Sequence, residues 1–327
     1  MVTILRQEHD DYEIIVSNNY SDDGAWELLN KFSKDRRVIL FQSDRKGMYD
    51  NWNNCLKRAS GEYVYIATSD DTCSSTILRD LESLLDNRPG VSIACCGLDE
   101  IDCSGQVLDP TDMRLNRILG SSLSELSKRS GASEFLLNIC FGPVWRSMTT
   151  VLFRRDLLSK TGMFRNDMGS LGDSDWALTA SLYSDVLFMP EKLATWRRHS
   201  AQASADQWGF RSRIVMLKSL EKILSEMSNV LPGSWKERSN WFKKLLYPRL
   251  WQLRTLSKLS RWEARGETLD FVKNFVRMCA YDFEFVKERF RCGFSGITHD
   301  DYDPSIAFGE LVEEFDVLWP PVPVDKI

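Results

Sequence analysis

Strand-like and helix-like segments alternate along the first hundred residues, and this alternation constrains the fold more than any other feature of the sequence. Short runs rich in β-branched and aromatic residues predict strands at 12–16, 37–41, 62–67 and 91–96. Apolar residues recurring at helical spacing predict helices at 26–32, 48–59 and 77–85. Because a helix separates each pair of strands, the strands should form a largely parallel sheet with helices on its faces. We therefore expect an α/β fold.

The pattern changes after residue 100. Further along we expect a hairpin turn at 102–107, strands at 144–153 and 186–189, and a helix at 176–183. From about residue 205 the pattern is helical and rich in Trp, Lys and Arg. A chain of 327 residues can form one large or two ordinary domains. We expect an α/β domain over residues 1–204 and a helical C-terminal region over 205–327.

Charge and hydropathy exclude several classes of protein. The chain has 42 basic and 47 acidic residues, a net charge of −5, which is too acidic for a general nucleic-acid binder. No apolar run approaches the ~18–20 residues that span a bilayer. Met1 is followed by Arg6, Glu8 and Asp10 instead of the apolar core of a signal peptide. We expect a cytoplasmic protein without a nucleic-acid partner.

The eight cysteines are scattered and form no C-x-x-C pair, so reduced and mostly buried thiols are the simplest interpretation. Cys95 and Cys96 are adjacent in the predicted strand 91–96. Neighbouring side chains of a strand point to opposite faces, which argues against a shared metal.

Polar clusters follow two of the predicted strands, where ligands bind in open parallel sheets. Asn18 and Asn19 begin a turn-rich segment that ends at Gly24, a composition that an ordinary turn and helix cap would also use. Asp70 and Asp71 follow the strand 62–67. Adjacent carboxylates repel by about 1–4 kcal/mol at surface dielectrics, and a bound Mg²⁺ or Mn²⁺ would remove that cost. The alternative is that Asp71 or Ser74 caps the next helix.

Two further clusters lie in the second half of the predicted α/β domain. Asp173 and Asp175 precede an apolar helix, where they could cap the helix or act as a general base. Arg197 and Arg198 stand beside His199, and two arginines together suit contact with an anion or a diphosphate.

The order of these motifs resembles that of a family 2 glycosyltransferase with the GT-A fold. The resemblance extends over about residues 3–204, and its individual signatures are weak while their order is specific. The segments that carry it are residues 12–24, 45–53, 61–71, 161–164, 172–175 and 198–204. It implies a Rossmann-like mixed sheet flanked by helices, followed here by a C-terminal helical extension.

The resemblance also implies an activity and a set of site residues. The activity is hexosyl transfer, with inversion, from a nucleotide-diphosphate sugar to an acceptor hydroxyl, in polysaccharide or glycolipid assembly. The acceptor would be a saccharide or a lipid-linked saccharide. Asp173 is the implied base, with Asp175 in reserve. A Mg²⁺ or Mn²⁺ ion is implied on Asp70, Asp71 and His199. The implied substrate-binding residues are Asn18, Asn19, Asp23, Arg45, Gly47, Asn51, Asp70 and Arg198.

Several positions depart from the family pattern. Thr68 stands where the metal motif usually has its first Asp, Asn18 replaces an Asp, and Gly172 replaces the Glu before Asp173. The family's first strand and most of its crossover helix, roughly 20–30 residues, have no counterpart before residue 3. We therefore expect Met1 to be an internal methionine. Because that strand lies in the middle of the family's sheet, its neighbours should be left unpaired.

Two questions stay open at this point. Apolar and basic residues interleave between 235 and 254, which indicates either helices packed on the catalytic domain or contact with the inner face of an anionic membrane. The departures above leave a non-catalytic nucleotide-sugar binding module as the alternative to an enzyme. A nucleotidyltransferase or a dinucleotide-dependent oxidoreductase is disfavoured, because no Gly-rich phosphate loop follows any strand.

Overall fold

The computed structural model of the chain describes residues 1–44, 47–109, 113–199, 202, 210–226, 272–273, 276, 279–280 and 304–325. The basic and aromatic segment 235–254 lies outside the described residues.

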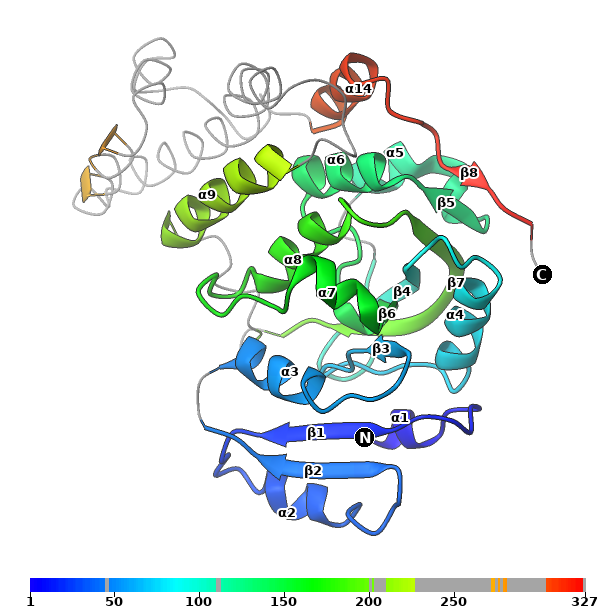
Figure 1. Cartoon of the computed structure of the whole chain (residues 1–327), viewed down its shortest axis with the longest axis vertical. Helices are drawn as coiled ribbons and strands as arrows, with labels where there is room; N and C mark the ends of the chain where they lie inside the picture. Colours follow the sequence, from blue (N-terminus) through cyan, green and yellow to red (C-terminus); the bar gives the residue numbers. More distant parts are fainter. Residues whose placement is uncertain are drawn as a thin grey trace.

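The N-terminal end of the fold is one βαβ unit, as the alternating periods predict. Strand β1 (Ile14–Asn18) pairs in parallel with β2 (Val38–Gln42), and helix α2 (Ala25–Asn30) connects them. Helix α1 (Val2–Leu5) precedes the unit. In Figure 1 this unit lies at the lower end of the molecule, and β1 and β2 form a sheet of their own.

A second, six-stranded sheet forms the body of the protein, in the order β3-β6-β4-β7-β5-β8. Its strands are β3 (Tyr63–Tyr65), β4 (Ile93–Ile101), β5 (Ser127–Arg129), β6 (Val151–Arg154), β7 (Val186–Arg197) and β8 (Val322–Pro323). β4 and β7 pair in parallel, whereas β6 is antiparallel to both β3 and β4. The sheet is therefore mixed, and β3, β4 and β7 run in one direction and end at the same edge.

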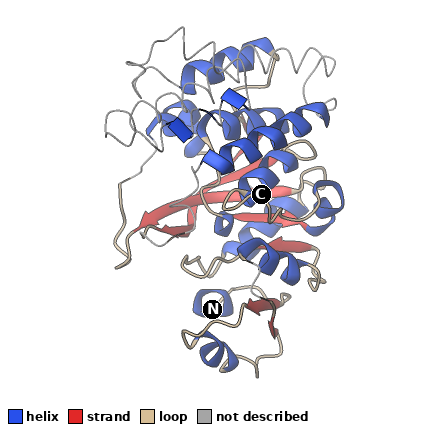
Figure 2. Ribbon diagram, turned by 90° about the vertical axis from the view of Figure 1, so that its left-hand side faces the viewer, coloured by secondary structure: helices blue, strands red, loops and turns tan. Residues whose placement is uncertain are grey.

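Helices cover both faces of this sheet (Figure 2). They are α3 (Met48–Leu56), α4 (Ile77–Asp86), α5 (Met113–Leu119), α6 (Gly131–Phe141), α7 (Leu158–Thr161), α8 (Gly172–Ala180), α9 (Phe210–Glu226) and α14 (Pro304–Glu314). Short 3₁₀ turns occur at Gly120–Leu123, Met148–Thr150 and Arg155–Leu157. Among the described residues, no helix combines the length and the hydropathy that crossing a bilayer requires.

The two faces of the sheet bury different clusters. On one face, α3 and α8 pack on the sheet around Trp176 and Phe153; on the other, α4 packs through Ile77 and Leu81. Cys95 belongs to the first cluster and Cys96 to the second. The expectation that these adjacent cysteines point to opposite faces of a strand is confirmed.

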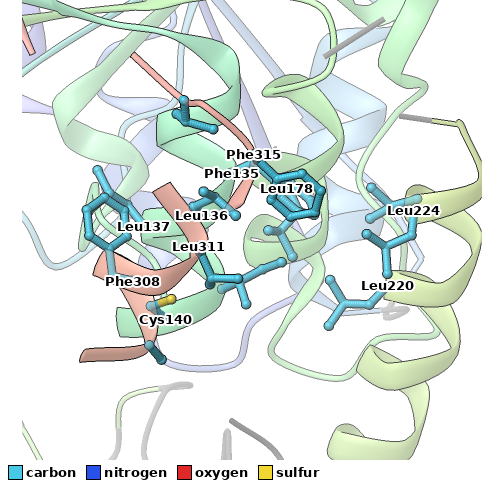
Figure 3. Packing of buried hydrophobic residues seen from close by; sticks show 14 of the residues in the cluster. Phe135, Leu136, Leu137, Cys140, Leu178, Leu220, Leu224, Phe308, Leu311 and Phe315 are labelled. Atoms are coloured by element: carbon cyan, nitrogen blue, oxygen red, sulfur yellow. The ribbon is translucent and has the colours of Figure 1, made fainter. Parts of the chain in front are cut away.

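The described C-terminal helices share a core with the α/β domain. Residues of α9 and α14, among them Leu220 and Phe308, pack with Phe135 of α6 and Leu178 of α8 in one cluster (Figure 3). Fully burying side chains of this size contributes about 1.5–3 kcal/mol each. α9 and α14 thus add to the stability of the domain that they cover.

One predicted strand forms only in part. The segment 144–153 is extended only from Val151, where β6 begins. Before it, Ser147 caps the 3₁₀ turn Met148–Thr150, and the Thr150 hydroxyl donates to the Trp145 carbonyl at 3.0 Å. These side-chain hydrogen bonds to the backbone stabilise turns in 144–150 in place of a strand, because serine and threonine hydroxyls compete with strand pairing.

The strands next to the expected first strand are unpaired on one side. β1 pairs only with β2, and β3 only with β6, among the strands that the structure describes.

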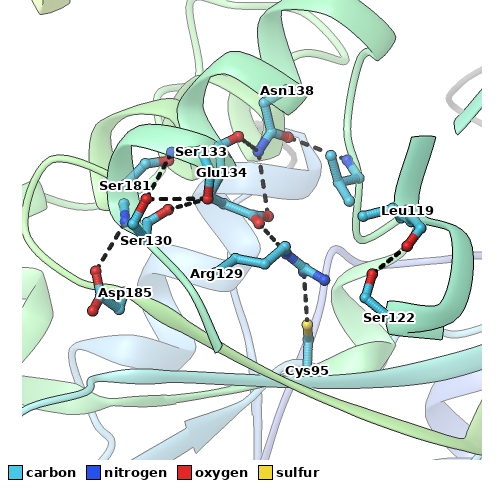
Figure 4. Close-up of polar contacts among 12 residues, drawn as sticks. Cys95, Leu119, Ser122, Arg129, Ser130, Ser133, Glu134, Asn138, Ser181 and Asp185 are labelled. Carbon is cyan, nitrogen blue, oxygen red and sulfur yellow. Dashed lines mark hydrogen bonds and ion pairs between the residues drawn. The ribbon is translucent and has the colours of Figure 1, made fainter. Parts of the chain in front are cut away.

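A buried ion pair fixes the start of α6 against the sheet (Figure 4). The Arg129 Nε donates to Glu134 Oε2 at 2.6 Å, and the two side chains are 2% and 0% exposed. The Arg129 Nη2 also contacts the Cys95 sulfur at 3.5 Å. Removing one member would leave an uncompensated charge in the interior, which costs far more than losing a surface pair.

We predict that Arg129→Met lowers the free energy of unfolding by about 3–5 kcal/mol, because Glu134 loses its buried partner. The double variant Arg129→Met, Glu134→Leu should lose less than the two single variants added together. Urea unfolding followed by circular dichroism measures each value. Lys128→Ala is the matched control, since Lys128 makes an exposed pair with Asp185 that contributes about 0–1 kcal/mol. Equal losses for Arg129 and Lys128 variants would contradict the prediction.

Candidate active site

One large cavity of about 2140 Å³ lies beside the ends of β1, β3 and β7. Nine of the residues predicted for the site line it: Asn18, Asn19, Asp23, Asn51, Asp70, Asp71, Asp173, Arg198 and His199. They come from segments as distant as the first strand and residue 199. The parallel course of β3, β4 and β7 explains part of this gathering, because the segments after these strands emerge at one edge of the sheet.

Two predicted residues, Gly47 and Asp175, are not brought to this cavity, and a third, Arg45, lies outside the described residues. Gly47 precedes α3 with φ of 110°, a conformation that suits glycine, and is not among the residues that line the cavity. Asp175 points to another helix, as described below.

The loop after β1 is held by its own polar side chains. Asn18 is buried, accepts a hydrogen bond from the Ser21 amide at 3.1 Å and donates to the Ser21 hydroxyl. Asn51 Oδ1 accepts hydrogen bonds from the Ser17 hydroxyl at 2.7 Å and the Ser43 hydroxyl at 2.8 Å. The Asn51 contacts join the ends of β1 and β2 to α3 at the cavity. The Asn18 side chain stabilises the turn through its two hydrogen bonds with Ser21.

Asp71 is the centre of a hydrogen-bond network. Its Oδ2 accepts from the hydroxyls of Thr68 at 2.6 Å, Ser147 at 2.7 Å and Thr149 at 3.2 Å. Its Oδ1 accepts from the Arg197 amide at 2.8 Å. These donors lie on the loop after β3, on the segment before β6 and at the end of β7, so Asp71 holds these three segments together. The alternative that Asp71 or Ser74 caps the next helix is wrong, because the N-cap of α4 is Thr76 and no side chain makes a capping hydrogen bond there.

Asp70 also lines the cavity, and its side chain contacts a different residue. Its Oδ2 lies 3.0 Å from His199 Nε2, and the two side chains are 37% and 31% exposed. The described residues contain no group of three or more His, Cys, Asp or Glu side chains arranged to hold a metal ion. Mg²⁺ and Mn²⁺ often take only one or two protein ligands and complete their shells with water and phosphate. Asp70 and His199 fit a cation of this kind, whereas Asp71 already accepts four hydrogen bonds.

Asp173 lies in the first turn of α8 and lines the cavity. Its Oδ1 accepts from the Tyr49 hydroxyl at 3.1 Å and the Ser174 amide at 2.7 Å. Burial raises the pKa of Asp173 above its usual value, while the Tyr49 hydrogen bond opposes that rise. A carboxylate with a raised pKa beside a cavity suits general-base chemistry.

The glycine before Asp173 makes room for Tyr49. A Cβ atom on Gly172 would lie 2.7 Å from the Tyr49 ring and 2.5 Å from the Arg165 carbonyl oxygen. Any larger residue would displace the tyrosine that bonds Asp173. The departure from the family's Glu at this position therefore has a steric reason in this chain.

Asp175 serves the packing of α8. It is buried, accepts a hydrogen bond from the Ser219 hydroxyl of α9 and lies 3.7 Å from Arg165 Nη1. The structure thus separates the two carboxylates that the sequence left as candidates for the base. Only Asp173 reaches the cavity.

The adjacent arginines also differ. Arg197 donates to the carbonyls of Asp70 and Asp102 at 2.9 and 2.8 Å, which locks the end of β7 to neighbouring loops. Arg198 lines the cavity, and its Nη1 donates to Glu100 at 2.9 Å. Tyr49, Glu100 and Arg146 were not among the residues predicted for the site. Glu100 is the penultimate residue of the long strand β4, so the rule that sites lie at strand ends could have found it.

Comparison with known proteins indicates the family and the fold. Residues 2–158 match the family model described as glycosyl transferase family 2. This part of the chain belongs to glycosyl transferase family 2. The S. aureus protein TarS, solved with UDP-GlcNAc, superposes with a TM-score of 0.53 over 79% of this chain and 74% of that one, at 17% identity. The likeness confirms the expected GT-A fold.

Curated relatives in the family include two described as glycosyltransferases. The uncharacterized glycosyltransferase EpsJ of Bacillus subtilis is 26% identical over 181 residues, 54% of this chain and 50% of that protein. The Escherichia coli protein WfaP, a UDP-Glc:alpha-D-GlcNAc-diphosphoundecaprenol beta-1,3-glucosyltransferase, is 37% identical over 68 residues, 20% of this chain and 27% of that protein. The chain spans 61% and 50% of the length of the first two curated relatives that it matches.

The contact between Tyr49 and Asp173 leads to a prediction about pH. If ionised Asp173 is the base, kcat/KM falls as the pH drops through its raised pKa. Tyr49→Phe keeps the ring and removes the hydrogen bond that lowers this pKa, so the acid limb should move to higher pH. The profile of kcat/KM against pH measures the limb. Tyr183→Phe, at an exposed tyrosine after α8, should leave it in place. A limb that stays, or moves to lower pH, in Tyr49→Phe would contradict this role.

Proposed function

We propose that the chain is an inverting glycosyltransferase of the hexosyl type, which moves a sugar from a nucleotide-diphosphate sugar to an acceptor hydroxyl. One observation carries the proposal: Asp70 and His199, which contact each other, line the same cavity as Asp173, which accepts a hydrogen bond from Tyr49. Asp70 and His199 could hold a cation that binds the leaving diphosphate, and Asp173 could take a proton from the acceptor hydroxyl. Family membership supports sugar transfer as the reaction class.

The donor would bind with its nucleoside near the loop after β1. Asn18, Asn19 and Asp23 line the cavity there, and Asn51 is held by Ser17 and Ser43. Amide and carboxylate groups can bind a base and a ribose through hydrogen bonds. Because TarS was solved with UDP-GlcNAc and WfaP is named for a UDP-Glc donor, uridine nucleotides are the first donors to test.

The diphosphate would lie at the loop after β3. A Mg²⁺ or Mn²⁺ ion bound there would neutralise charge that grows on the leaving diphosphate. In this chain Asp70 and His199 would hold the ion, and Arg198 would add a charge-assisted hydrogen bond to phosphate. Asp71 would act indirectly, by keeping Asp70 turned to the cavity.

Asp173 would act on the acceptor. Its carboxylate would take the proton of the attacking hydroxyl, a role worth typically about 10²–10⁴ in rate. The Tyr49 hydroxyl donates a hydrogen bond to Oδ1 of Asp173 and would orient the carboxylate during proton transfer. Displacement on the face away from the diphosphate would invert the anomeric carbon.

The acceptor and setting are proposed from the relatives. WfaP is named for a diphosphoundecaprenol-linked acceptor, and we propose a saccharide or lipid-linked saccharide as acceptor here, in polysaccharide or glycolipid assembly. Such an acceptor would place the protein in the cytoplasm at the inner face of the membrane. We propose that residues 1–204 form the catalytic α/β domain and that residues 205–327 form a helical C-terminal region.

Hydrolysis of nucleotide sugars tests the proposal. The full chain, incubated with a panel of UDP, GDP and dTDP sugars with and without Mn²⁺, should release the nucleoside diphosphate from at least one donor, faster with Mn²⁺. Binding of a donor without turnover, in the presence of saccharide acceptors, would favour the non-catalytic binding module. Neither binding nor turnover with any donor would overturn the function.

Two carboxylates of α8 give a matched pair of variants. Asp173→Asn should lower turnover by about 10²–10⁴ while donor affinity stays within a few-fold, because only the base is lost. Asp175→Asn should instead lower the thermal stability, since Asp175 joins α8 to Ser219 of α9. Steady-state kinetics and thermal melts separate the two effects. Near-normal turnover in Asp173→Asn would overturn its assignment.

A further inference from the structure

We infer that Arg146 and Arg198 form a clamp for the diphosphate of the sugar nucleotide, and that the buried Glu100 positions both arginines. The inference rests on the proposed function and adds two residues, Arg146 and Glu100, to its diphosphate site.

Glu100 is placed behind the cavity wall. It is the penultimate residue of β4, and it lies opposite Trp196 in the parallel pairing of β4 with β7. Its side chain is 6% exposed, and its two oxygens bind different arginines. Oε1 accepts from Arg146 Nη2 at 3.0 Å, and Oε2 accepts from Arg198 Nη1 at 2.9 Å. One carboxylate therefore sets the spacing of two guanidinium groups.

Trp196 adds a second restraint on the same two groups. The Arg198 guanidinium carbon lies 4.7 Å from the centroid of a Trp196 ring, and that of Arg146 lies 5.7 Å from it. A guanidinium group near an aromatic face at these distances gains a cation–π interaction. Each arginine is thus held by a carboxylate and by the indole, which restricts its rotamers before any ligand binds.

The two arginines are accessible from the cavity. Both arginine side chains line the cavity, and they are 25% and 38% exposed. An arginine offers several N–H donors in a planar fork, so a guanidinium that binds a carboxylate on one edge can still pair with phosphate oxygens on another.

The position of the clamp indicates the diphosphate. Arg198 precedes His199, which contacts Asp70 at the loop proposed to hold the diphosphate and its cation. Two guanidinium groups on separate oxygens of Glu100 can each meet a different phosphate group.

The backbone at Arg146 gives an independent indication. Its φ is 62°, in the left-handed region that non-glycine residues seldom adopt. Strained backbone of this kind concentrates at ligand sites, where the surrounding structure enforces it. Here the conformation places a cation at the cavity.

Calorimetry with UDP and uridine tests the clamp, because only UDP carries the diphosphate. Arg146→Gln should weaken UDP binding by about tenfold or more, as expected for the loss of a hydrogen bond between charged groups, and leave uridine binding unchanged. Glu100→Gln should do the same, since it releases both arginines from their shared carboxylate. Arg146→Lys keeps the charge without the fork and should lie between Arg146→Gln and the wild type.

The matched control is Asp99→Asn, which removes an exposed pair with Lys192 at the neighbouring position of β4 and should change neither affinity. Thermal melts show whether each variant is folded. Equal losses for UDP and uridine would mean that Glu100 and Arg146 only support the fold, and would overturn the clamp. Normal UDP binding in Arg146→Gln with a raised KM for a diphosphate-linked acceptor would assign the subsite to the acceptor instead. A wild-type chain that binds no nucleoside diphosphate would overturn the proposed function itself.

Discussion

The carboxylate of Asp71 is the interaction on which the candidate site depends. It accepts hydrogen bonds from three hydroxyls and from the Arg197 amide, and these donors come from the loop after β3, the segment before β6 and the end of β7. A carboxylate that accepts hydrogen bonds from several fixed donors is itself fixed in direction. The neighbouring Asp70 is left to contact His199 at the cavity. Asp71 therefore holds the loops of the site together, whereas Asp70 is the carboxylate that we propose for the cation.

Sheet geometry brings the remaining groups to the same place. Because β3, β4 and β7 run in one direction, the segments that follow Tyr65, Glu100 and Trp196 meet at one edge. Asp173 lies in the helical layer, in the first turn of α8, and it accepts a hydrogen bond from the hydroxyl of Tyr49 in α3. The helices that hold α8 in place, α6 and α9, extend the core in which α14 also packs. The described C-terminal helices are thus linked to the base through α8.

Local periodicity was enough to predict much of the fold. The βαβ unit of β1, α2 and β2 follows from runs of β-branched residues and from helical spacing, and the opposite faces of Cys95 and Cys96 follow from strand geometry. The segment 144–153 was harder, because Ser147 and Thr150 make local hydrogen bonds that no apolar pattern reveals. Most of the predicted site residues line one cavity, since positions after strands are marked in the sequence. The choice between Asp173 and Asp175 needed the structure, because it depends on contacts between residues far apart in the sequence. Ser219 is 44 residues from Asp175, and Tyr49 is 124 residues from Asp173.

The most direct test compares Asp70→Asn with Asp71→Asn in one protein preparation, measuring Mn²⁺-dependent UDP binding by calorimetry and the melting temperature of each. We expect Asp70→Asn to lose the gain in UDP affinity that Mn²⁺ gives and to melt like the wild type. We expect Asp71→Asn to melt at a clearly lower temperature, because three hydroxyls and an amide lose a charged acceptor. An Asp70→Asn variant that retains the full effect of Mn²⁺, or an Asp71→Asn variant with unchanged stability, would contradict this division between the two carboxylates.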